Sequence, residues 1–231
     1  MNPLNFEDVT RYVEDHIGDF HRRRLDNLAA LELNNVLKHK NPYLFKAKSI
    51  LAGADLVKTL LDSHLSSQEE TIFGEFLEGL AIFVCGKVYN GRKSSAEGID
   101  LEFEKAGTLY IVSIKSGPNW GNSSQVSKMR DNFKKAKRIL RTSGGASTVV
   151  AVNGCCYGRD NKPDKGDYFK LCGQTFWEFI SGNPNLYLEI IEPLGHQAHT
   201  RNEDFREAYA KMLNIFTEQF AQDFYTPRLA H

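Results

Sequence analysis

The sequence predicts a mixed α/β fold in which a β-sheet is flanked by helices. Residues 1–65 carry apolar side chains at spacings of three and four, as amphipathic helices do. Residues 99–105 and 108–115 show the alternation, or the β-branched and aromatic content, that is typical of strands. Helical and strand-like segments then alternate as far as about residue 225, an order that indicates a sheet with helical flanks.

The first 65 residues are expected to form a helical region of their own. Their pattern breaks at "NPYLF", residues 41–45, because Pro42 interrupts a helix. A second helical run, "KAKSILAGADLVKTLLDSHL", follows this break. We therefore expect two domains, a helical N-terminal region of residues 1–65 and a core of residues 66–231 that includes a C-terminal helix.

The core is expected to open with a helix over "SSQEETIFGEFLEGLAIFVCGKVYNG". Ser66 or Ser67 would cap this helix, with a glutamate three residues later as capping-box partner. Its apolar residues fall on one face, and "YNGRKSS" ends it as a loop. The two strands at 99–105 and 108–115 follow, and Ala106-Gly107 marks the turn between them.

The second half of the core alternates between helices, loops and strands. A basic helix, "VSKMRDNFKKAKRILRTSGG", is expected to end at Gly144 and Gly145. Next come a strand in "ASTVVAVNGCCYG", a polar loop in "RDNKPDKGDYFKLC" and a short helix in "GQTFWEFISGN". A strand in "LYLEIIEPL", residues 186–194, and a long helix from about 200 to 225 complete the chain.

Composition limits the classes of protein to consider. The chain has 231 residues with 29 basic and 29 acidic side chains, which argues against a protein that coats nucleic acid by bulk charge. This balance does not exclude local stripes of basic residues that contact phosphates. It shows no apolar run of the roughly 18 residues that a membrane helix needs and no apolar signal core at its N-terminus. We expect a cytoplasmic protein with no membrane partner, and four cysteines that are reduced and mostly buried.

One acid and one lysine stand at matching ends of the two predicted strands. Asp100 closes "GID", and Lys115 lies in "SIKSG". A carboxylate together with a strand carbonyl is a set of hard oxygen ligands that suits Mg²⁺. A nearby lysine can orient an attacking water and offset the charge of a phosphorane-like transition state. These are the parts that phosphodiester hydrolysis needs.

The arrangement resembles the PD-(D/E)xK nuclease superfamily, in which an aspartate at the start of a hairpin is followed by acid-x-Lys on the next strand. Asp100 matches the first acid and Lys115 matches the lysine, while Ser113 stands in the acid position two residues before the lysine. The resemblance implies a restriction-endonuclease-like mixed β-sheet core flanked by helices, and Mg²⁺ as the cofactor.

A helix can supply the missing acid, as it does in some members of this superfamily. Glu75 and Glu78 in "FGEFLEGLA" precede the hairpin. Glu78 lies nearer the face that packs on the sheet, where a carboxylate needs a partner or a metal, so we favour Glu78 over Glu75. Ser113 could hold a metal-bound water, and the carbonyl of Ile114 could be a direct ligand. The predicted catalytic residues are therefore Asp100, Lys115, Glu78 and Ser113, with Asp100, Glu78 and Ile114 as metal ligands.

The resemblance extends over roughly residues 65–225. The stretches "SIKSGPNWGNSSQ", "CYGRDNKPDKGDYFKLCGQTFWEFISG" and "IIEPLGH" are similar to type II restriction endonucleases that cut GGNCC-type sites. This similarity implies Mg²⁺-dependent cleavage of double-stranded DNA at a short palindrome by a homodimer, with residues 1–65 serving dimerisation or DNA contact. Two alternatives remain. One is another nuclease of the superfamily, such as a repair or resolvase-like enzyme. The other, which Ser113 keeps open, is a catalytically inactive DNA-binding module.

DNA contacts are expected from three segments. The basic helix offers its outer face to phosphates, and the loop after Lys115 offers short polar side chains. A Ser or Asn of this loop can cap the helix, whose N-terminus would then face a phosphate. The polar loop at 159–165 offers base-reading side chains, although turn chemistry explains its composition equally well. The predicted DNA-binding residues are Asn119, Asn122, Ser123, Lys128, Lys134, Lys135, Arg159 and Lys162.

Overall fold

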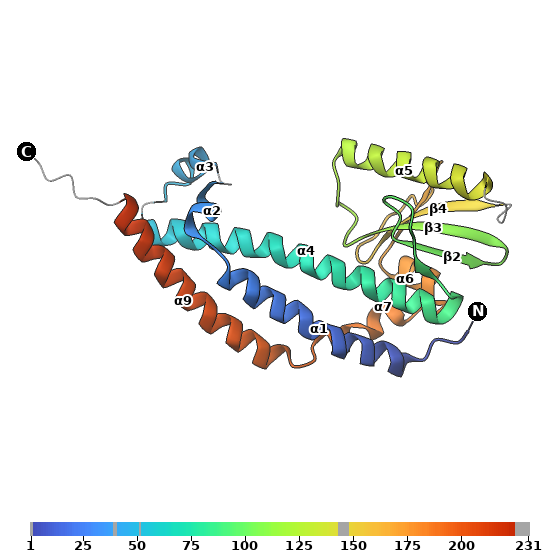
Figure 1. Ribbon diagram of the computed structural model, residues 1–231, viewed down its shortest axis with the longest axis horizontal. Coiled ribbons are helices and arrows are strands. Elements are labelled where there is room, and N and C mark those ends of the chain that lie inside the picture. The colour runs from blue at the N-terminus through green and yellow to red at the C-terminus, as the bar shows by residue number, and fades with distance from the viewer. Residues whose placement is uncertain (1, 39–40, 51, 143–147, 225–231) are drawn as a thin grey trace, which may run out of the picture. The chain divides into compact units, whose positions relative to one another are not determined.

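The computed structural model describes residues 2–38, 41–50, 52–142 and 148–224. Contacts group the chain into two compact units. The sheet unit consists of Met1–Ile17 and Phe73–His196, and the helical unit consists of Gly18–Ile72 and Gln197–His231. Helices α1 (Phe6–Ala29) and α4 (Gly53–Tyr89) each contribute one part to each unit (Figure 1).

The described part of the sheet unit contains one sheet of five strands in the order β1-β2-β3-β4-β5. Their bounds are β1 Arg92–Lys93, β2 Leu101–Lys105, β3 Thr108–Lys115, β4 Val149–Cys155 and β5 Phe169–Cys172. The first three strands pair antiparallel, and β3, β4 and β5 pair parallel, so the sheet is mixed. The register pairs Ser113 with Asn153 and Lys115 with Cys155, which places the end of β3 beside the end of β4.

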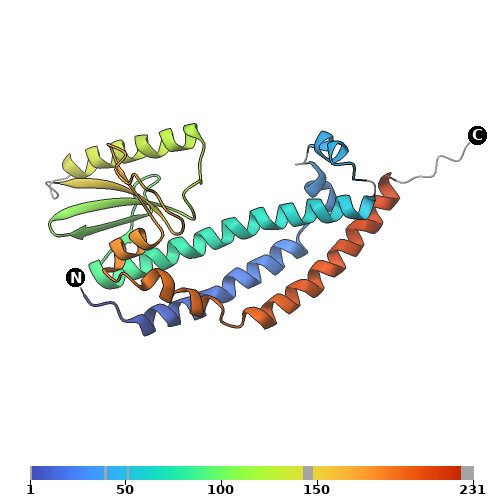
Figure 2. The same cartoon turned by 180° about the vertical axis from the view of Figure 1, so that it is seen from behind.

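Helices cover both faces of this sheet (Figures 1 and 2). On one face lies α5 (Ser123–Thr142), whose Met129, Phe133 and Ala136 are buried against Ile111 and Ala151. The other face packs against the C-terminal part of α4 and against α6 (Gln174–Ser181) and α7 (Leu186–Glu189). The apolar face of "TIFGEFLEGLAIFV" is buried there as predicted, with Leu80, Ala81 and Val84 inaccessible to solvent.

The hairpin between β2 and β3 turns at Ala106 and Gly107, as predicted. Both residues have positive φ angles, 50° and 74°. Two consecutive positive φ angles are typical of the tight hairpin turns whose twist matches that of the flanking strands. The turn sets the register in which Leu101 pairs with Val112, and it therefore brings Asp100 to the end of β3.

The helical unit is built from α2 (Leu33–Lys38), α3 (Pro42–Ala47), α9 (Ala198–Phe224) and the adjoining parts of α1 and α4. Its core contains Leu28, Val36, Leu60, Leu61 and Phe216. A half-buried arginine, Arg24, links three helices through Glu69 at 2.6 Å and Asn202 at 2.8 Å.

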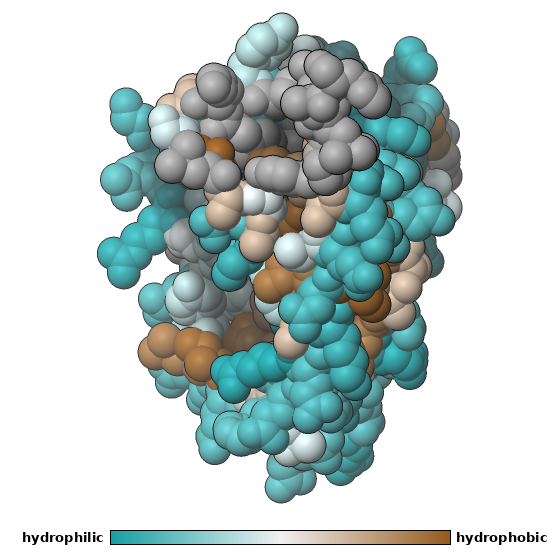
Figure 3. All heavy atoms as spheres, turned by 90° about the vertical axis from the view of Figure 1, so that its left-hand side faces the viewer, coloured by the Kyte–Doolittle hydropathy of each residue, from teal (hydrophilic) through white to brown (hydrophobic). Residues whose placement is uncertain are grey.

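Hydrophobic side chains also reach the surface of the helical unit. Tyr43 is 82% exposed and Ile215 is 48% exposed. Figure 3, viewed from the left-hand side of Figure 1, shows hydrophobic atoms in brown lying between hydrophilic ones. Ile215 also lines a cavity of about 480 Å³ together with Leu31, Leu33 and Met212.

The predicted fold class is confirmed, but the predicted start of the core helix at Ser66 or Ser67 is wrong. Helix α4 runs without a break from Gly53 to Tyr89. Ser67 donates its hydroxyl to the carbonyl of Ser63 at 3.1 Å, and Thr71 donates to that of Ser67 at 3.1 Å. Hydroxyl side chains can bond to the preceding helical turn in this way, and they then continue a helix instead of capping a new one.

The predicted strand at 186–194 is also wrong, because these residues form α7 and α8 (Ile191–Leu194). Leu186, Ile190 and Pro193 are buried, whereas Leu188 and Ile191 are 65% and 58% exposed. This spacing of four and three residues is helical, and it was concealed by the continuous apolar run.

Two short strands were missed. β5 lies in the segment predicted as a polar loop, and β1 lies in "NGRKSS". Helix α5 is described to Thr142, and the predicted helix end at Gly144 and Gly145 lies outside the described residues.

The division into domains at residue 65 stays a prediction, since contact grouping does not test which parts fold independently. Cys85, Cys155, Cys156 and Cys172 are all free and buried, which confirms the prediction made for them. None of the helices in the described residues combines the length and the apolar character needed to cross a bilayer.

Candidate active site

Asp100 lies at the end of β2 that adjoins the end of β3, and three groups of β3 surround its carboxylate. The main-chain N–H of Ile114 donates to Oδ2 at 2.6 Å, and the hydroxyl of Ser113 donates to the same oxygen at 3.4 Å. Nζ of Lys115 lies 4.0 Å from this oxygen. The structure therefore brings together three of the four predicted catalytic side chains.

Gly98 is required for this placement. Its φ is +71°, which side-chain-bearing residues rarely adopt, and a Cβ on it would collide with the side-chain amide of Asn132 on α5. The chain can therefore turn beneath α5 and enter β2 at Asp100. The glycine of "GID" thus has a structural role that the sequence pattern alone did not explain.

The pKa of Asp100 is raised above the ordinary value for an aspartate. Burial is the largest cause, and the negative charge of Glu78 raises the pKa further. The N–H of Ile114 and the charges of Lys115 and Lys93 oppose the shift without cancelling it. Burial thus disfavours the ionised carboxylate, and a cation bound beside it would offset its charge.

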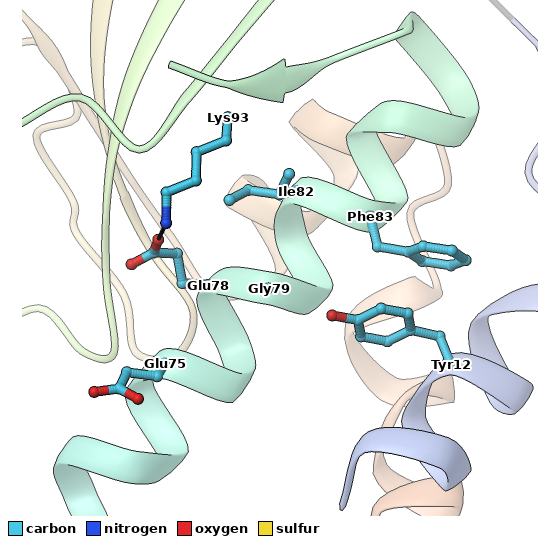
Figure 4. A pocket seen from close by; sticks show the side chains of 7 residues that line it. All are labelled: Tyr12, Glu75, Glu78, Gly79, Ile82, Phe83 and Lys93. Carbon is cyan, nitrogen blue, oxygen red and sulfur yellow. Dashed lines mark hydrogen bonds and ion pairs between the residues drawn. The ribbon is translucent and has the colours of Figure 1, made fainter. Parts of the chain in front are cut away.

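Glu78 reaches this cluster from α4. It is half-buried, and its Oε1 accepts a hydrogen bond from Nζ of Lys93 at 3.3 Å (Figure 4). Glu75 is exposed, and both glutamates line the same cavity of about 630 Å³, together with Tyr12, Ile82 and Phe83. The electrostatic effect of Glu78 on Asp100 and its lower exposure support the preference for Glu78 over Glu75.

The oxygen atoms around Asp100 are of the type that a hard cation binds, although they are few. In an extended strand, the N–H and C=O of one residue point to the same side, so the carbonyl of Ile114 faces the side of Asp100. Two carboxylates and one carbonyl are oxygen ligands of the type that Mg²⁺ takes, and Mg²⁺ retains waters at its other positions. Within the described ranges, no cluster of three or more His, Cys, Asp or Glu side chains could hold a metal ion. Ser113, which is only 2% exposed, lies beside Asp100 and contributes a hydroxyl, not a carboxylate.

Two neighbours of Lys115 were not predicted to belong to this site. The ring centroid of Trp120 lies 5.3 Å from Nζ of Lys115. Nε1 of Trp120 donates to Oδ1 of Asn153 at 3.1 Å, and Nδ2 of Asn153 donates to the carbonyl of Ser113 at 3.1 Å. Lys93, which contacts Glu78 from a strand that was predicted as a loop, was not predicted to belong to this site either. A polar Asn within the apolar run "VVAVNGCC" was the one available sequence signal.

The basic helix α5 presents a mixture of paired and unpaired charges. Arg130 forms a bidentate pair with Asp167 at 2.9 and 3.1 Å, and Lys135 pairs with Glu97 at 3.2 Å. Lys134 lies 3.8 Å from Asp131. Lys128 is exposed and, among the described residues, pairs with no acid. Lys128 is accordingly the predicted contact whose charge is most available to a phosphate.

The loop between β3 and α5 supplies a helix cap. Oδ1 of Asn122 accepts from the N–H of Gln125 at 3.0 Å, and Oε1 of Gln125 accepts from the N–H of Asn122 at 3.0 Å. This reciprocal pair is a capping box, so the carbonyl oxygen of the Asn122 side chain serves the helix. Asn119 and Ser123 are exposed beside it.

The predicted base-reading loop is held together by an aspartate. Asp160 pairs with Lys165 at 3.0 Å and with Lys170 at 3.7 Å, and it accepts the N–H of Lys162 at 2.9 Å. The side chains of Arg159 and Lys162 are exposed. Arg159 lines a polar cavity of about 370 Å³ near the start of α6.

Comparison with known proteins identifies the family. A family model described as type II restriction endonuclease EcoO109I matches residues 7–202, which is most of the chain. No curated protein matches the sequence.

Proposed function

The chain belongs to the EcoO109I family of type II restriction endonucleases, and from this premise we propose that it is a Mg²⁺-dependent enzyme that hydrolyses double-stranded DNA at a short palindromic site. The observation that carries the proposal is the approach of Lys115 to Asp100 at the end of β3, with Glu78 near enough for its charge to raise the pKa of Asp100. Membership of the family makes DNA the partner and phosphodiester hydrolysis the reaction. The metal, the residue roles and the site are the parts that we propose.

Each residue has a role that its position supports. Asp100, Glu78 and the carbonyl of Ile114 would hold the cation. When bound, Mg²⁺ would supply Lewis-acid stabilisation of the scissile phosphate. Lys115 would orient the attacking water and offset the charge that develops on the phosphate. Ser113 would hold a water beside Asp100, through a hydroxyl that already lies 3.4 Å from its carboxylate.

The recognition site proposed is of the GGNCC type, because of the similarity of the stretches after Lys115 and around residues 156–182. A palindrome is read by two copies related by a two-fold axis, so the proposed enzyme is a homodimer. Residues 1–65 would serve dimerisation or DNA contact. Phosphate contacts would come from Lys128, Lys134 and Lys135, with Asn119, Asn122, Ser123, Arg159 and Lys162 near the bases or the backbone.

The direct test is to incubate the purified protein with plasmid DNA and MgCl₂ and to sequence the fragment ends. Discrete ends at a GGNCC-type palindrome, lost on adding a chelator, are the expected result. Lys115→Ala and Asp100→Ala should each abolish cleavage while far-UV circular dichroism stays unchanged. Near-normal digestion by either variant would remove these residues from the proposed site.

One observation favours a second function, a catalytically inactive DNA-binding module. Ser113 stands where the superfamily pattern has a carboxylate, and it is buried. Tight binding of a specific DNA site without cleavage under any divalent metal would establish that alternative. Cleavage that leaves no common sequence at the fragment ends would instead indicate a repair or resolvase-like nuclease.

A further inference from the structure

Asn153 is a polar residue buried in the parallel part of the sheet. It is 1% exposed, and it lies opposite Ser113 on the neighbouring strand. Its amide donates to the carbonyl of Ser113, and its carbonyl accepts from the indole of Trp120, both at 3.1 Å. A buried amide without partners is costly, so these two bonds hold β3 and the indole in fixed relation to each other.

Trp120 is held from a second direction by packing. It lies in the loop between β3 and α5 and contacts the hydrophobic cluster that includes Met129 and Phe133. Its ring is therefore fixed by an apolar contact with this cluster and by a hydrogen bond to β4. Such a ring is a rigid platform, in contrast to the flexible side chain of a lysine.

Lys115 has few other restraints. Its ammonium lies 4.0 Å from Asp100 and 5.3 Å from the Trp120 ring centroid, and the side chain is 31% exposed. A cation within about 6 Å of an aromatic ring centroid is attracted to the face of the ring. The tryptophan therefore restricts where the ammonium can lie.

We propose that Trp120 is a positioning residue for Lys115, and that Asn153 fixes the tryptophan in place. The inference rests on the proposed function, in which Lys115 acts at the scissile phosphate. A catalytic group must be held close to its productive geometry, and neighbouring residues hold it there by restricting the conformations of its side chain. The contacts from Asn153 to Trp120 and from Trp120 to Lys115 connect the lysine to β4 without involving Asp100.

The contact can be tested without any cleavage assay. In protein with ¹³C-labelled lysine, ring current from Trp120 should shift the Cε protons of Lys115 upfield, and Lys115→Met would identify the signal by its loss. Trp120→Leu should return the signal to the ordinary lysine position, whereas Trp120→Phe should retain part of the shift. Tyr168→Leu is the matched control, because it removes an aromatic side chain from the same hydrophobic cluster and should leave the Lys115 signal unchanged.

The catalytic consequence is tested by plasmid cleavage with MgCl₂. Trp120→Leu should lower kcat about 5- to 30-fold, the rate equivalent of losing one cation–π contact. KM for DNA should change by less than about two-fold, because the ring acts through Lys115 and not on the substrate. Trp120→Phe should recover most of the loss. Asn153→Ala should also lower kcat, because it removes the hydrogen bond that fixes the indole. An Asn153→Ala protein that thermal melts show to be folded and that cleaves at the normal rate would overturn the role of Asn153.

The outcomes separate the two proposals. If the Lys115 signal of the wild type is not shifted and Trp120→Leu cleaves DNA at the normal rate, the positioning role alone is overturned. A raised KM with unchanged kcat in Trp120→Leu would also overturn it, since Trp120 would then be a DNA contact. A wild-type protein that cleaves no DNA would overturn the proposed function and the catalytic part of this inference, whatever the Lys115 signal shows.

Discussion

At the scale of single residues, the proposed acid from α4, Glu78, is the component that most distinguishes the proposed site. Glu78→Gln should lower cleavage by roughly 100-fold or more, because the substitution removes a charged oxygen ligand. Glu75→Gln removes an equal charge from the same cavity and should have a much smaller effect. Plasmid cleavage at several MgCl₂ concentrations measures both.

Glu75→Gln is the matched control, since both glutamates belong to one helix and line one cavity. Equal losses in the two variants would mean that the cavity needs negative charge in general. A large loss in Glu75→Gln alone would reverse the assignment of the ligand.

Asp100 gives a prediction that does not depend on activity. Its raised pKa means that the folded protein disfavours the ionised form. The contribution of this carboxyl group to the free energy of unfolding therefore falls as the pH rises through its titration. Asp100→Asn should therefore stabilise the metal-free protein near neutral pH, since a side-chain oxygen still accepts from Ile114. Thermal melts with and without MgCl₂ measure this, and the Mg²⁺-dependent increase in Tm should be lost in the variant.

Glu104→Gln, an exposed carboxylate on the same strand, is the control for this experiment. It should leave both the Tm and its Mg²⁺ dependence near those of the wild type. An Asp100→Asn protein that is less stable than the wild type without metal would contradict the account of its surroundings.

At the scale of elements, α5 allows paired and unpaired cations to be compared on one helix. Lys128→Gln should weaken DNA binding and reduce the slope of log K against log salt by about one, because one phosphate contact is lost. Lys135→Gln should have a smaller effect, since Glu97 already offsets that charge. Fluorescence anisotropy of labelled DNA at several salt concentrations, in Ca²⁺ instead of Mg²⁺, measures the slopes. Identical slopes for the two variants and the wild type would argue against α5 as a phosphate contact.

Helix α1 carries a buried histidine in the helical unit. Burial lowers the pKa of His21 to about 4, and the charges of Arg24 and Arg201 contribute in the same direction. The unfolded chain then binds the proton that the folded protein does not, so stability falls as pH decreases from about 6.5 towards 4. Between pH 7 and 5 the loss should be on the order of 1 to 2 kcal/mol, measured by urea unfolding.

His21→Gln should remove this part of the pH dependence. His199→Gln replaces a histidine whose side chain is 84% exposed, and it should leave the dependence close to that of the wild type. If both variants lose stability between pH 7 and 5 as steeply as the wild type does, carboxylates and not His21 are responsible.

At the scale of the whole molecule, a palindromic site implies two copies of the chain. We expect the protein to sediment at twice the mass of one chain. Ile215→Glu should shift this equilibrium towards the monomer, because the side chain is 48% exposed in the helical unit among apolar neighbours. Leu188→Glu, 65% exposed in the sheet unit, is the control. A dimer that Leu188→Glu disrupts and Ile215→Glu does not would place the interface on the sheet unit.

Much of the fold could be predicted from local pattern. Periodicity identified β2 and α5, in which apolar side chains recur at the spacing of one buried face. The strands β3 and β4, in which consecutive residues are buried, were identified by their β-branched and apolar content. Local pattern failed at residues 186–194, where the apolar residues are nearly continuous, and at Ser66 and Ser67, where hydroxyls bond within a helix. It also missed β5, whose Phe169 is 41% exposed and whose partner strand lies earlier in the chain.

By itself, the sequence determined the fold class, the hairpin of β2 and β3, and the pairing of Asp100 with Lys115. These follow from residue composition and from spacings within about 20 residues. The tertiary structure decided which groups reach that pair. Glu78, Lys93, Trp120 and Asn153 come from α4, β1, the loop before α5 and β4. Their approach depends on how helices pack on both faces of the sheet and on the register of β3 with β4. These are long-range contacts, and no local pattern of residues encodes their geometry.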